Sequence, residues 1–224
     1  MMATLEPMNP VTVVLVDDHA LVRQGFRRLL EDHPRIRVLA EGRTGLDAVE
    51  LARVHHPDVM LLDMAMPELN GIEAAEQIVR MDPRIKLMIL SMYAEESYVR
   101  QALRVGIKGY LLKDALDLDL AQAVLAVAAG QSYLSPGIAA LLIEAVREGR
   151  EGEPDDPFER LTQREKQILQ LVAESCSNKE IGQRLGISPN TVAVHRANLM
   201  QTLGLHRTAE LVLYAVKKGL IKPE

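Results

Sequence analysis

Short apolar runs alternate with amphipathic segments along the first part of the chain. Residues 59–62, Val-Met-Leu-Leu, form an apolar run without polar alternation, which is typical of a strand buried on both faces of a parallel sheet. Similar runs lie before and after it, and a segment with helical periodicity follows each one. The pattern predicts strands at 11–16, 36–41, 58–62, 85–90 and 109–112, and helices at about 19–31, 45–55, 70–80, 95–104 and 115–129.

Five strand-helix units in succession indicate the fold class. Short crossover helices connect parallel strands, so the pattern predicts an α/β fold with a doubly wound, five-stranded parallel sheet. All strands of such a sheet end at one edge, and ligands bind outside their carboxyl ends. A further helix is predicted at about 136–147. The segment 148–157 combines glycine, proline and acidic residues without an apolar face, which indicates a linker.

From Phe158 onward the periodicity is helical throughout, and the sequence marks the helix starts. Three starts carry capping signals, namely Thr162 with Glu165, Ser177 with Glu180, and Ser188 before Pro189. The pattern predicts a small all-α domain of four helices at about 162–175, 177–185, 188–203 and 207–218. Only Gly186 and Ile187 separate the second helix from the third, which is the spacing of a helix-turn-helix.

Charge divides the chain near the same linker. Residues 1–157 carry 25 acidic and 16 basic side chains, whereas residues 158–224 carry 6 acidic and 10 basic ones. A helix-turn-helix on a basic domain suggests DNA binding. We therefore expect three parts: a first domain at 10–130, a helical extension and linker at 131–157, and a DNA-binding domain at 158–224.

Cysteine usage and apolar content indicate the compartment. Cys176 is the single cysteine of the chain, so no internal disulfide is possible. The first ten residues lack the basic start and the apolar core of a signal peptide, and no run of about 18 apolar residues is present to span a membrane. We therefore expect a cytoplasmic protein without a membrane partner.

Polar side chains follow four of the predicted strands. Asp17 and Asp18 come after the first strand, Asp63 after the third, Ser91 after the fourth and Lys113 after the fifth. Three carboxylates at one edge would repel one another unless a cation lies between them, and oxygen ligands with room for water suit Mg²⁺. The metal and the lysine would then bind a phosphoryl group, which an aspartate accepts as nucleophile. No glycine-rich phosphate loop is present, so we expect another protein, rather than ATP, to be the donor.

These motifs resemble two known domains. Residues 11–129 resemble the flavodoxin-like receiver domain of two-component response regulators, through the acidic pair, Leu-Leu-Asp-Met-Ala-Met-Pro at 61–67, and Lys-Gly-Tyr-Leu-Leu-Lys at 108–113. Residues 158–218 resemble the LuxR-type helix-turn-helix, through Leu-Thr-Gln-Arg-Glu at 161–165, Ser-Asn-Lys-Glu-Ile at 177–181 and Thr-Val-Ala-Val-His at 191–195. The combination resembles response regulators of the NarL/FixJ type.

The resemblance implies a role for each residue of the acidic edge. Asp63 matches the phosphoacceptor, and the implied Mg²⁺ ligands are Asp63, Asp18, Asp17 through water, and the Ala65 carbonyl. Ser91 matches the switch hydroxyl, Lys113 the counter-charge of the phosphoryl group, and Tyr110 the aromatic residue whose rotamer follows the switch. The implied partners are a sensor histidine kinase as donor, double-stranded DNA with an inverted repeat, and a second copy of the chain after phosphorylation. RNA polymerase is a further partner that the resemblance allows.

The second domain supplies candidate DNA contacts. Lys179, Arg184, His195, Arg196 and Arg207 are expected near backbone phosphates, and Val194 and Ala197 near bases or thymine methyl groups. Thr191 is a further expected DNA contact. Ala193 and Thr202 stand where the family often has lysine, so we expect a shallow salt dependence and reliance on dimerisation. Leu211, Val212 and Ala215 on the last helix are the expected dimer contacts.

Two alternative functions remain at this point. A Mg²⁺-dependent phosphatase of the haloacid dehalogenase type also uses an aspartyl nucleophile, but that family carries it after the first strand in an Asp-x-Asp pattern. Here Asp17 and Asp18 are adjacent, and Asp63 follows the third strand. The other alternative is a phosphorylation-independent DNA-binding or scaffold protein with a receiver-like interaction domain. We expect the protein not to be an enzyme, with no catalytic activity other than its own phosphorylation and dephosphorylation.

Overall fold

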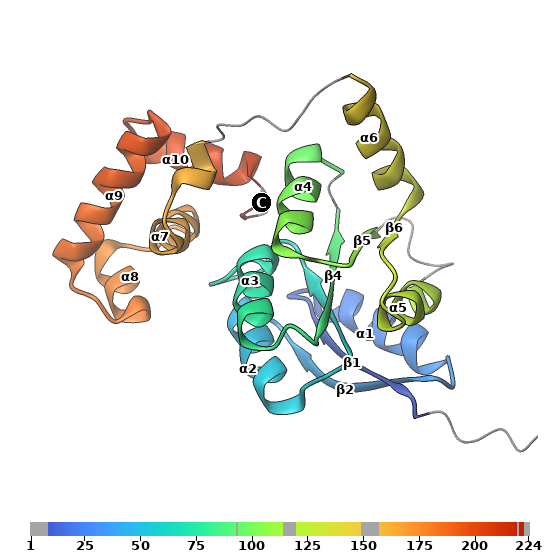
Figure 1. Ribbon diagram of the computed structural model, residues 1–224. Coiled ribbons are helices and arrows are strands. Elements are labelled where there is room, and N and C mark those ends of the chain that lie inside the picture. Colours follow the sequence, from blue (N-terminus) through green and yellow to red (C-terminus); the bar gives the residue numbers. More distant parts are fainter. Residues whose placement is uncertain (1–8, 93, 114–119, 149–156, 219, 222–224) are drawn as a thin grey trace, which may run out of the picture.

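The computed structural model describes residues 9–92, 94–113, 120–148, 157–218 and 220–221. A parallel sheet with helices on both faces forms the first domain, and a cluster of helices forms the second (Figure 1). The strands are β1 (Val11–Val16), β2 (Ile36–Gly42), β3 (Val59–Asp63), β4 (Lys86–Ser91), β5 (Gly109–Leu112) and β6 (Tyr133–Leu134). They lie in the order β2-β1-β3-β4-β5-β6, and every neighbouring pair is parallel.

A sixth strand extends the predicted five-stranded sheet. Tyr133 and Leu134 pair with Gly109 and Tyr110 of β5, and the Tyr133 N–H donates to the Lys108 carbonyl at 2.9 Å. The sequence pattern missed β6 because two residues are too few to show the periodicity of a strand. The other five strands match their predicted ranges to within one residue, and β3 is buried along its whole length.

Helices cover both faces of the sheet. α2 (Gly45–His55), α3 (Gly71–Met81) and α4 (Glu96–Val105) pack on one face, and α1 (Ala20–Glu31) and α5 (Leu120–Ala128) pack on the other. α6 (Pro136–Arg147) packs against α4 and β5. These helices confirm the predicted ones, except that the first residues of the predicted helix 115–129 lie outside the described part of the chain.

Four α-helices and a short 3₁₀ helix form the second domain. They are η2 (Pro157–Arg160), α7 (Gln163–Ala173), α8 (Asn178–Leu185), α9 (Pro189–Leu203) and α10 (Thr208–Lys217). Thr162 and Ser177 form the predicted capping boxes, and Ser188 caps α9. Gly186 ends α8 at a φ of 66°, a left-handed conformation that favours glycine and allows the short turn into α9.

The two domains contact each other through α7 and α10. Gln170 of α7 is hydrogen-bonded to the loop between β3 and α3, and the Tyr98 hydroxyl of α4 donates to the Lys217 carbonyl of α10. Most of the predicted linker 148–157 lies outside the described residues. Among the described residues, no helix combines the length and apolarity that crossing a membrane requires.

Glu73 of α3 is a buried carboxyl near this contact. The residue is 2% exposed, and within the described part of the chain neither carboxylate oxygen has a hydrogen-bond partner. Burial raises the pKa of Glu73 to about 8, Lys166 of α7 opposes the rise, and Glu76 adds to it. Arg80 and Arg104 line the same pocket. Glu73 is therefore mostly protonated at neutral pH.

We expect the thermal unfolding midpoint to fall as the pH rises from 4.5 to about 8. The folded-state pKa of Glu73 lies above its ordinary value of 4.5, so the stability that protonation contributes is complete below pH 4.5 and is lost as the pH rises through about 8. Glu73→Gln removes this titration, and scanning calorimetry should show a flatter decline. Glu31→Gln, at an exposed position of α1, should keep the wild-type decline. An equally steep decline in Glu73→Gln would contradict the assignment.

Candidate functional site

Four strands bring polar side chains to one edge of the sheet. Asp17 follows β1, Asp63 ends β3, Ser91 ends β4 and Lys113 follows β5. These strands are consecutive neighbours and all run parallel, so their carboxyl ends meet at the same edge. The structure therefore assembles the cluster that the sequence pattern predicted.

The Lys113 ammonium lies between two carboxylates. Its Nζ is 2.7 Å from Asp17 Oδ2 and 2.9 Å from Asp63 Oδ1. All three side chains are at most 5% exposed, so water screens these charges little. One ammonium opposes two carboxylates, which leaves the buried site attractive to a further cation.

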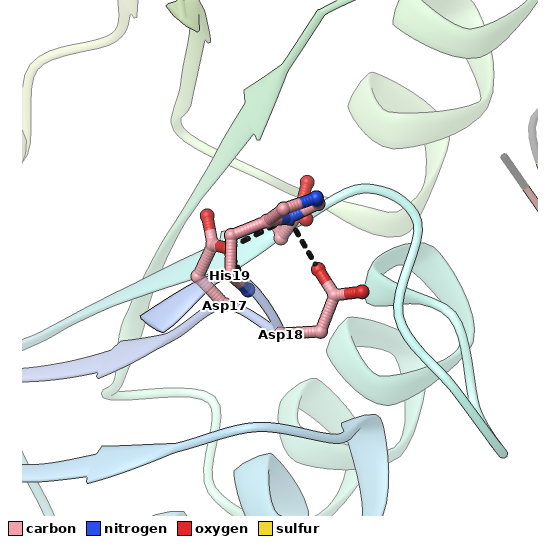
Figure 2. A group of neighbouring side chains, drawn as sticks. Asp17, Asp18 and His19 are labelled. Carbon is pink, nitrogen blue, oxygen red and sulfur yellow. Dashed lines mark hydrogen bonds and ion pairs between the residues drawn. The ribbon is translucent and has the colours of Figure 1, made fainter. Parts of the chain in front are cut away.

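Asp18 and His19 extend the cluster toward solvent, and Figure 2 shows the imidazole turned toward both aspartates. His19 Nδ1 is 2.8 Å from Asp18 Oδ1, and the His19 N–H donates to Asp17 Oδ1 at 2.8 Å. Ligand atoms of Asp17, Asp18, His19 and Asp63 all lie within 4.8 Å of one another. Three carboxylates at this spacing fit Mg²⁺, which prefers oxygen ligands. The sequence pattern did not predict His19 as a residue of the site, because the only sign of that role in the sequence is its position directly after Asp17 and Asp18.

The loop between β3 and α3 packs closely against the strand that it follows. The Gly71 N–H donates to the Met64 carbonyl at 2.9 Å, and the Asn70 side chain caps α3. A Cβ on Gly71 would lie 2.1 Å from the Asp63 carbonyl oxygen, so glycine alone fits there. Ala65, whose carbonyl is a predicted metal ligand, is buried in the same turn.

Arg23 of α1 is a site residue that the sequence interpretation missed. Its Nη1 donates to the Asp17 carbonyl at 2.6 Å, and its Nε donates to Glu41 Oε2 at 3.0 Å. Arg23 is buried and shares the inner face of α1 with Phe26 and Leu30. The signal that could have found it is an arginine on the buried face of a helix. Arg23 holds the turn that carries the acidic pair.

Tyr110 and Ser91 are hydrogen-bonded to each other beside the carboxylate cluster. Tyr110 is fully buried, and burial raises the pKa of its hydroxyl to about 12, while the hydrogen bond with Ser91 opposes the rise. The phenol therefore stays protonated at neutral pH. Both predicted switch residues are thus in contact, and any movement of Ser91 would change the environment of the Tyr110 ring.

Helix α9 presents an open face in the second domain. The predicted base contacts Val194 and Ala197 are exposed, as is the predicted DNA contact Thr191, and Val194 is 59% exposed. His195 is half-buried, and within the described residues its Nδ1 has no hydrogen-bond partner. An exposed apolar side chain on a helix with polar neighbours fits contact with a thymine methyl group.

The side chains of the predicted phosphate contacts differ in their exposure to solvent and in their hydrogen bonds within the domain. Lys179, Arg184 and Arg207 are exposed. Arg196 instead donates to Asn178 Oδ1 at 2.7 Å and to Thr208 Oγ1 at 3.1 Å, which ties α9 to the starts of α8 and α10. We infer that, in this conformation, Arg196 positions the recognition helix through these two hydrogen bonds.

The expected dimer contacts on α10 require a correction. Leu211 and Ala215 are fully buried in the core of the second domain, so they cannot contact a partner in this conformation. Their spacing of four residues places both on the inner face of α10, which packs against α7. Val212 is half-buried, and Leu213 is the large apolar residue exposed on α10, at 63%.

Comparison with protein families agrees with this geometry. Residues 13–125 match the response regulator receiver domain, and residues 159–215 match the luxR family of bacterial regulatory proteins. The chain belongs to the two-component response regulators with a LuxR-type DNA-binding domain. It is a phosphorylation-regulated transcription factor, and the phosphatase alternative is thereby set aside.

Several known proteins are similar to this chain over nearly their whole length. The chain is 37% identical over 228 residues to the transcriptional regulatory protein DegU of Brevibacillus brevis, covering 96% of each. It is 38% identical to the oxygen regulatory protein NreC of Staphylococcus carnosus, covering 93% of this chain and 98% of NreC. A structure of the RcsB–DNA complex matches with a TM-score of 0.58 and 25% identity, covering 92% of this chain and 98% of that one.

Removal of the Lys113 charge should destabilise the first domain. Lys113→Met leaves two buried carboxylates without their cation, a change that typically costs about 3–5 kcal/mol. We expect a lower melting temperature, and a larger stabilisation by added Mg²⁺ than in the wild type. Lys108→Met, which removes an exposed lysine just before β5, is the control. Equal melting temperatures for the two variants would refute the role of the ion pair.

A lysine on the open face of α9 should steepen the salt dependence of DNA binding. Ala193 is exposed, and Ala193→Lys adds one phosphate contact per protomer. The slope of log K against log salt should then become more negative by about 0.9 for each added contact, as measured by fluorescence anisotropy. Val146→Lys on α6 carries the same charge away from α9. If both variants shift the slope equally, net charge rather than contact is responsible.

Proposed function

We propose that Asp63 accepts a phosphoryl group from a phosphohistidine of a sensor histidine kinase. The phosphorylated chain then dimerises and binds an inverted repeat in double-stranded DNA to regulate transcription. The observation that carries this proposal is the buried contact of Lys113 with Asp63, next to Asp17 and Asp18. Family membership supports a kinase as donor.

The residues of the cluster divide the chemistry among them. A carboxylate oxygen of Asp63 attacks phosphorus, the bond between phosphorus and the histidine nitrogen breaks, and its electron pair stays on the imidazole. An acyl phosphate forms on Asp63. Asp17, Asp18, Asp63 and the Ala65 carbonyl would hold Mg²⁺, which, when bound, neutralises charge on the phosphoryl oxygens.

Two further residues respond to the new phosphoryl group. The Lys113 ammonium, which pairs with the Asp17 and Asp63 carboxylates before the transfer, then pairs with the phosphoryl oxygens as well. The Ser91 hydroxyl turns toward the same oxygens, and its hydrogen bond with Tyr110 transmits the change to the buried ring. Hydrolysis of the acyl phosphate by water would return the chain to its starting state.

The second domain would read DNA through the exposed face of α9. Similarity to the RcsB–DNA complex supports this use of the helix-turn-helix. Two recognition helices, one from each protomer, match the symmetry of an inverted repeat. The exposed Leu213 on α10 replaces Leu211 and Ala215 as the apolar candidate for the dimer surface. Contact with RNA polymerase stays a prediction.

Selection of bound sequences from random DNA tests the proposal directly. The full chain is used with and without Mg²⁺ and beryllofluoride, a phosphoryl mimic, and Asp63→Asn is run in parallel. We expect an inverted repeat to be enriched only with the mimic and only when Asp63 is intact. The same enrichment in every condition would show that the receiver does not gate DNA binding, and the scaffold alternative gains if no sequence is enriched.

A further inference from the structure

Residues at the C-terminal end of helix α7 in the DNA-binding domain are hydrogen-bonded to the loop between β3 and α3. Gln170 is fully buried, its Nε2 donates to the Met66 carbonyl at 2.7 Å, and its Oε1 accepts from the Asn70 N–H at 3.1 Å. Glu174 Oε1 accepts from the Glu68 N–H and from Gln170 Nε2, both at 3.0 Å. We name Gln170 and Glu174 the α7 clasp.

The carboxamide of Gln170 fits the loop in one orientation. Both N–H groups of Nε2 are used, one by the Met66 carbonyl and one by Glu174, and Oε1 is used by Asn70. A flipped amide would place its N–H groups against the Asn70 N–H and its oxygen against the Met66 carbonyl. Two buried loop groups would then lack partners, which is costly. Gln170 therefore fixes the separation between the two arms of the loop.

The gripped loop belongs to the phosphoacceptor site. Met66 directly follows Ala65, whose carbonyl the proposed function assigns to the metal. The peptide unit of the Ala65 carbonyl and that of the Met66 carbonyl meet at the Met66 Cα, so the bond from Gln170 to the Met66 carbonyl holds the backbone on one side of that Cα and restricts how far the Ala65 carbonyl can turn. Glu68 has a φ of 68°, a left-handed conformation that disfavours residues other than glycine, and its bond to Glu174 helps to hold it there.

The clasp also contacts the DNA-binding side, yet it leaves the reading face of α9 open. Glu174 Oε2 is 3.5 Å from Arg184 Nη1 on α8, which is a candidate phosphate contact. The base-facing residues Val194 and Ala197 are exposed in the same structure. Contact between the domains therefore acts on the loop and on Arg184, and it does not cover the base-reading side chains.

We propose that Gln170 and Glu174 are positioning residues for the phosphoacceptor loop, and that the clasp opposes phosphoryl transfer to Asp63. This inference rests on the proposed function of Asp63. A phosphoryl group adds a charge of roughly −1.5 to −2 near a loop that already binds the Glu174 carboxylate, so it disfavours the clasp. Coupling between two sites is reciprocal, so loss of the clasp favours phosphorylation to the same extent.

Hydrogen exchange and the affinity for beryllofluoride, both measured on the full chain, test this coupling. Gln170→Ala removes the Gln170 bonds of the clasp. Gln167→Ala is the matched control, since within the described residues the Gln167 side chain of the same helix accepts a hydrogen bond only from Arg164 of α7. Deuterium uptake of residues 66–70 should rise in Gln170→Ala, and in the wild type with Mg²⁺ and beryllofluoride. The dissociation constant of beryllofluoride in the presence of Mg²⁺ should fall at least about fivefold in Gln170→Ala, the lower end of ordinary coupling between sites. Gln167→Ala should match the wild type in both measurements.

The outcomes separate the clasp from the function of Asp63. Slow uptake at 66–70 in Gln170→Ala, equal to the wild type, overturns the clasp. An unchanged affinity for beryllofluoride with raised deuterium uptake overturns the coupling and leaves Asp63 as phosphoacceptor. Failure of the wild type and of both variants to bind beryllofluoride overturns the proposed function, while the comparison of deuterium uptake in metal-free buffer still decides whether the clasp forms. If Gln170→Ala does not fold, Glu174→Ala, which removes the bond to Glu68, replaces it with the same expected direction.

Discussion

The contact of Lys113 with Asp17 and Asp63 is the interaction on which the site depends. Three charged groups that are at most 5% exposed come from the ends of three strands. Removing such groups from water costs free energy that their attraction recovers only at close range. The sheet provides that range, since β1 and β3 are neighbours and β5 follows beyond β4. A register slip of one residue would turn a carboxylate away from the ammonium, so fold and chemistry fix each other.

Contacts with backbone atoms hold the carboxylates in place. Arg23 binds the Asp17 carbonyl, which sets the turn after β1, and the missing side chain of Gly71 lets α3 start against the Asp63 carbonyl. The Asn70 cap then satisfies the first turn of α3. Each of these contacts involves backbone atoms, so each fixes the direction in which the neighbouring acidic side chain leaves the chain. These contacts therefore position the acidic side chains without any bound ligand.

The difference between side chains at strand ends and contacts with backbone atoms explains what the sequence could predict. Asp17, Asp63 and Lys113 each end an apolar run, and parallel strands bring such ends together, so their meeting followed from the pattern. Gln170 and Arg23 were missed because they are polar residues on amphipathic helices and bind backbone carbonyls and N–H groups, which leave no signal in a side-chain pattern. Leu211 and Ala215 were assigned to a dimer surface because an apolar stripe is the same whether it meets another helix of its own domain or a second chain. Only packing distinguishes the two.

The contact between the domains combines a satisfied polar group with an unsatisfied one. Gln170 is fully buried with all of its amide hydrogens bonded, whereas Glu73 is buried nearby with neither oxygen paired in the described residues. The first favours docking and the second opposes it, because a buried carboxyl without partners loses its hydration. If every polar group were paired, the contact would resist a change of one charge at Asp63. Within the described residues the contact therefore keeps one buried carboxyl unpaired beside a fully paired amide, and such a contact is more open to a change of charge at Asp63 than one in which every polar group is paired.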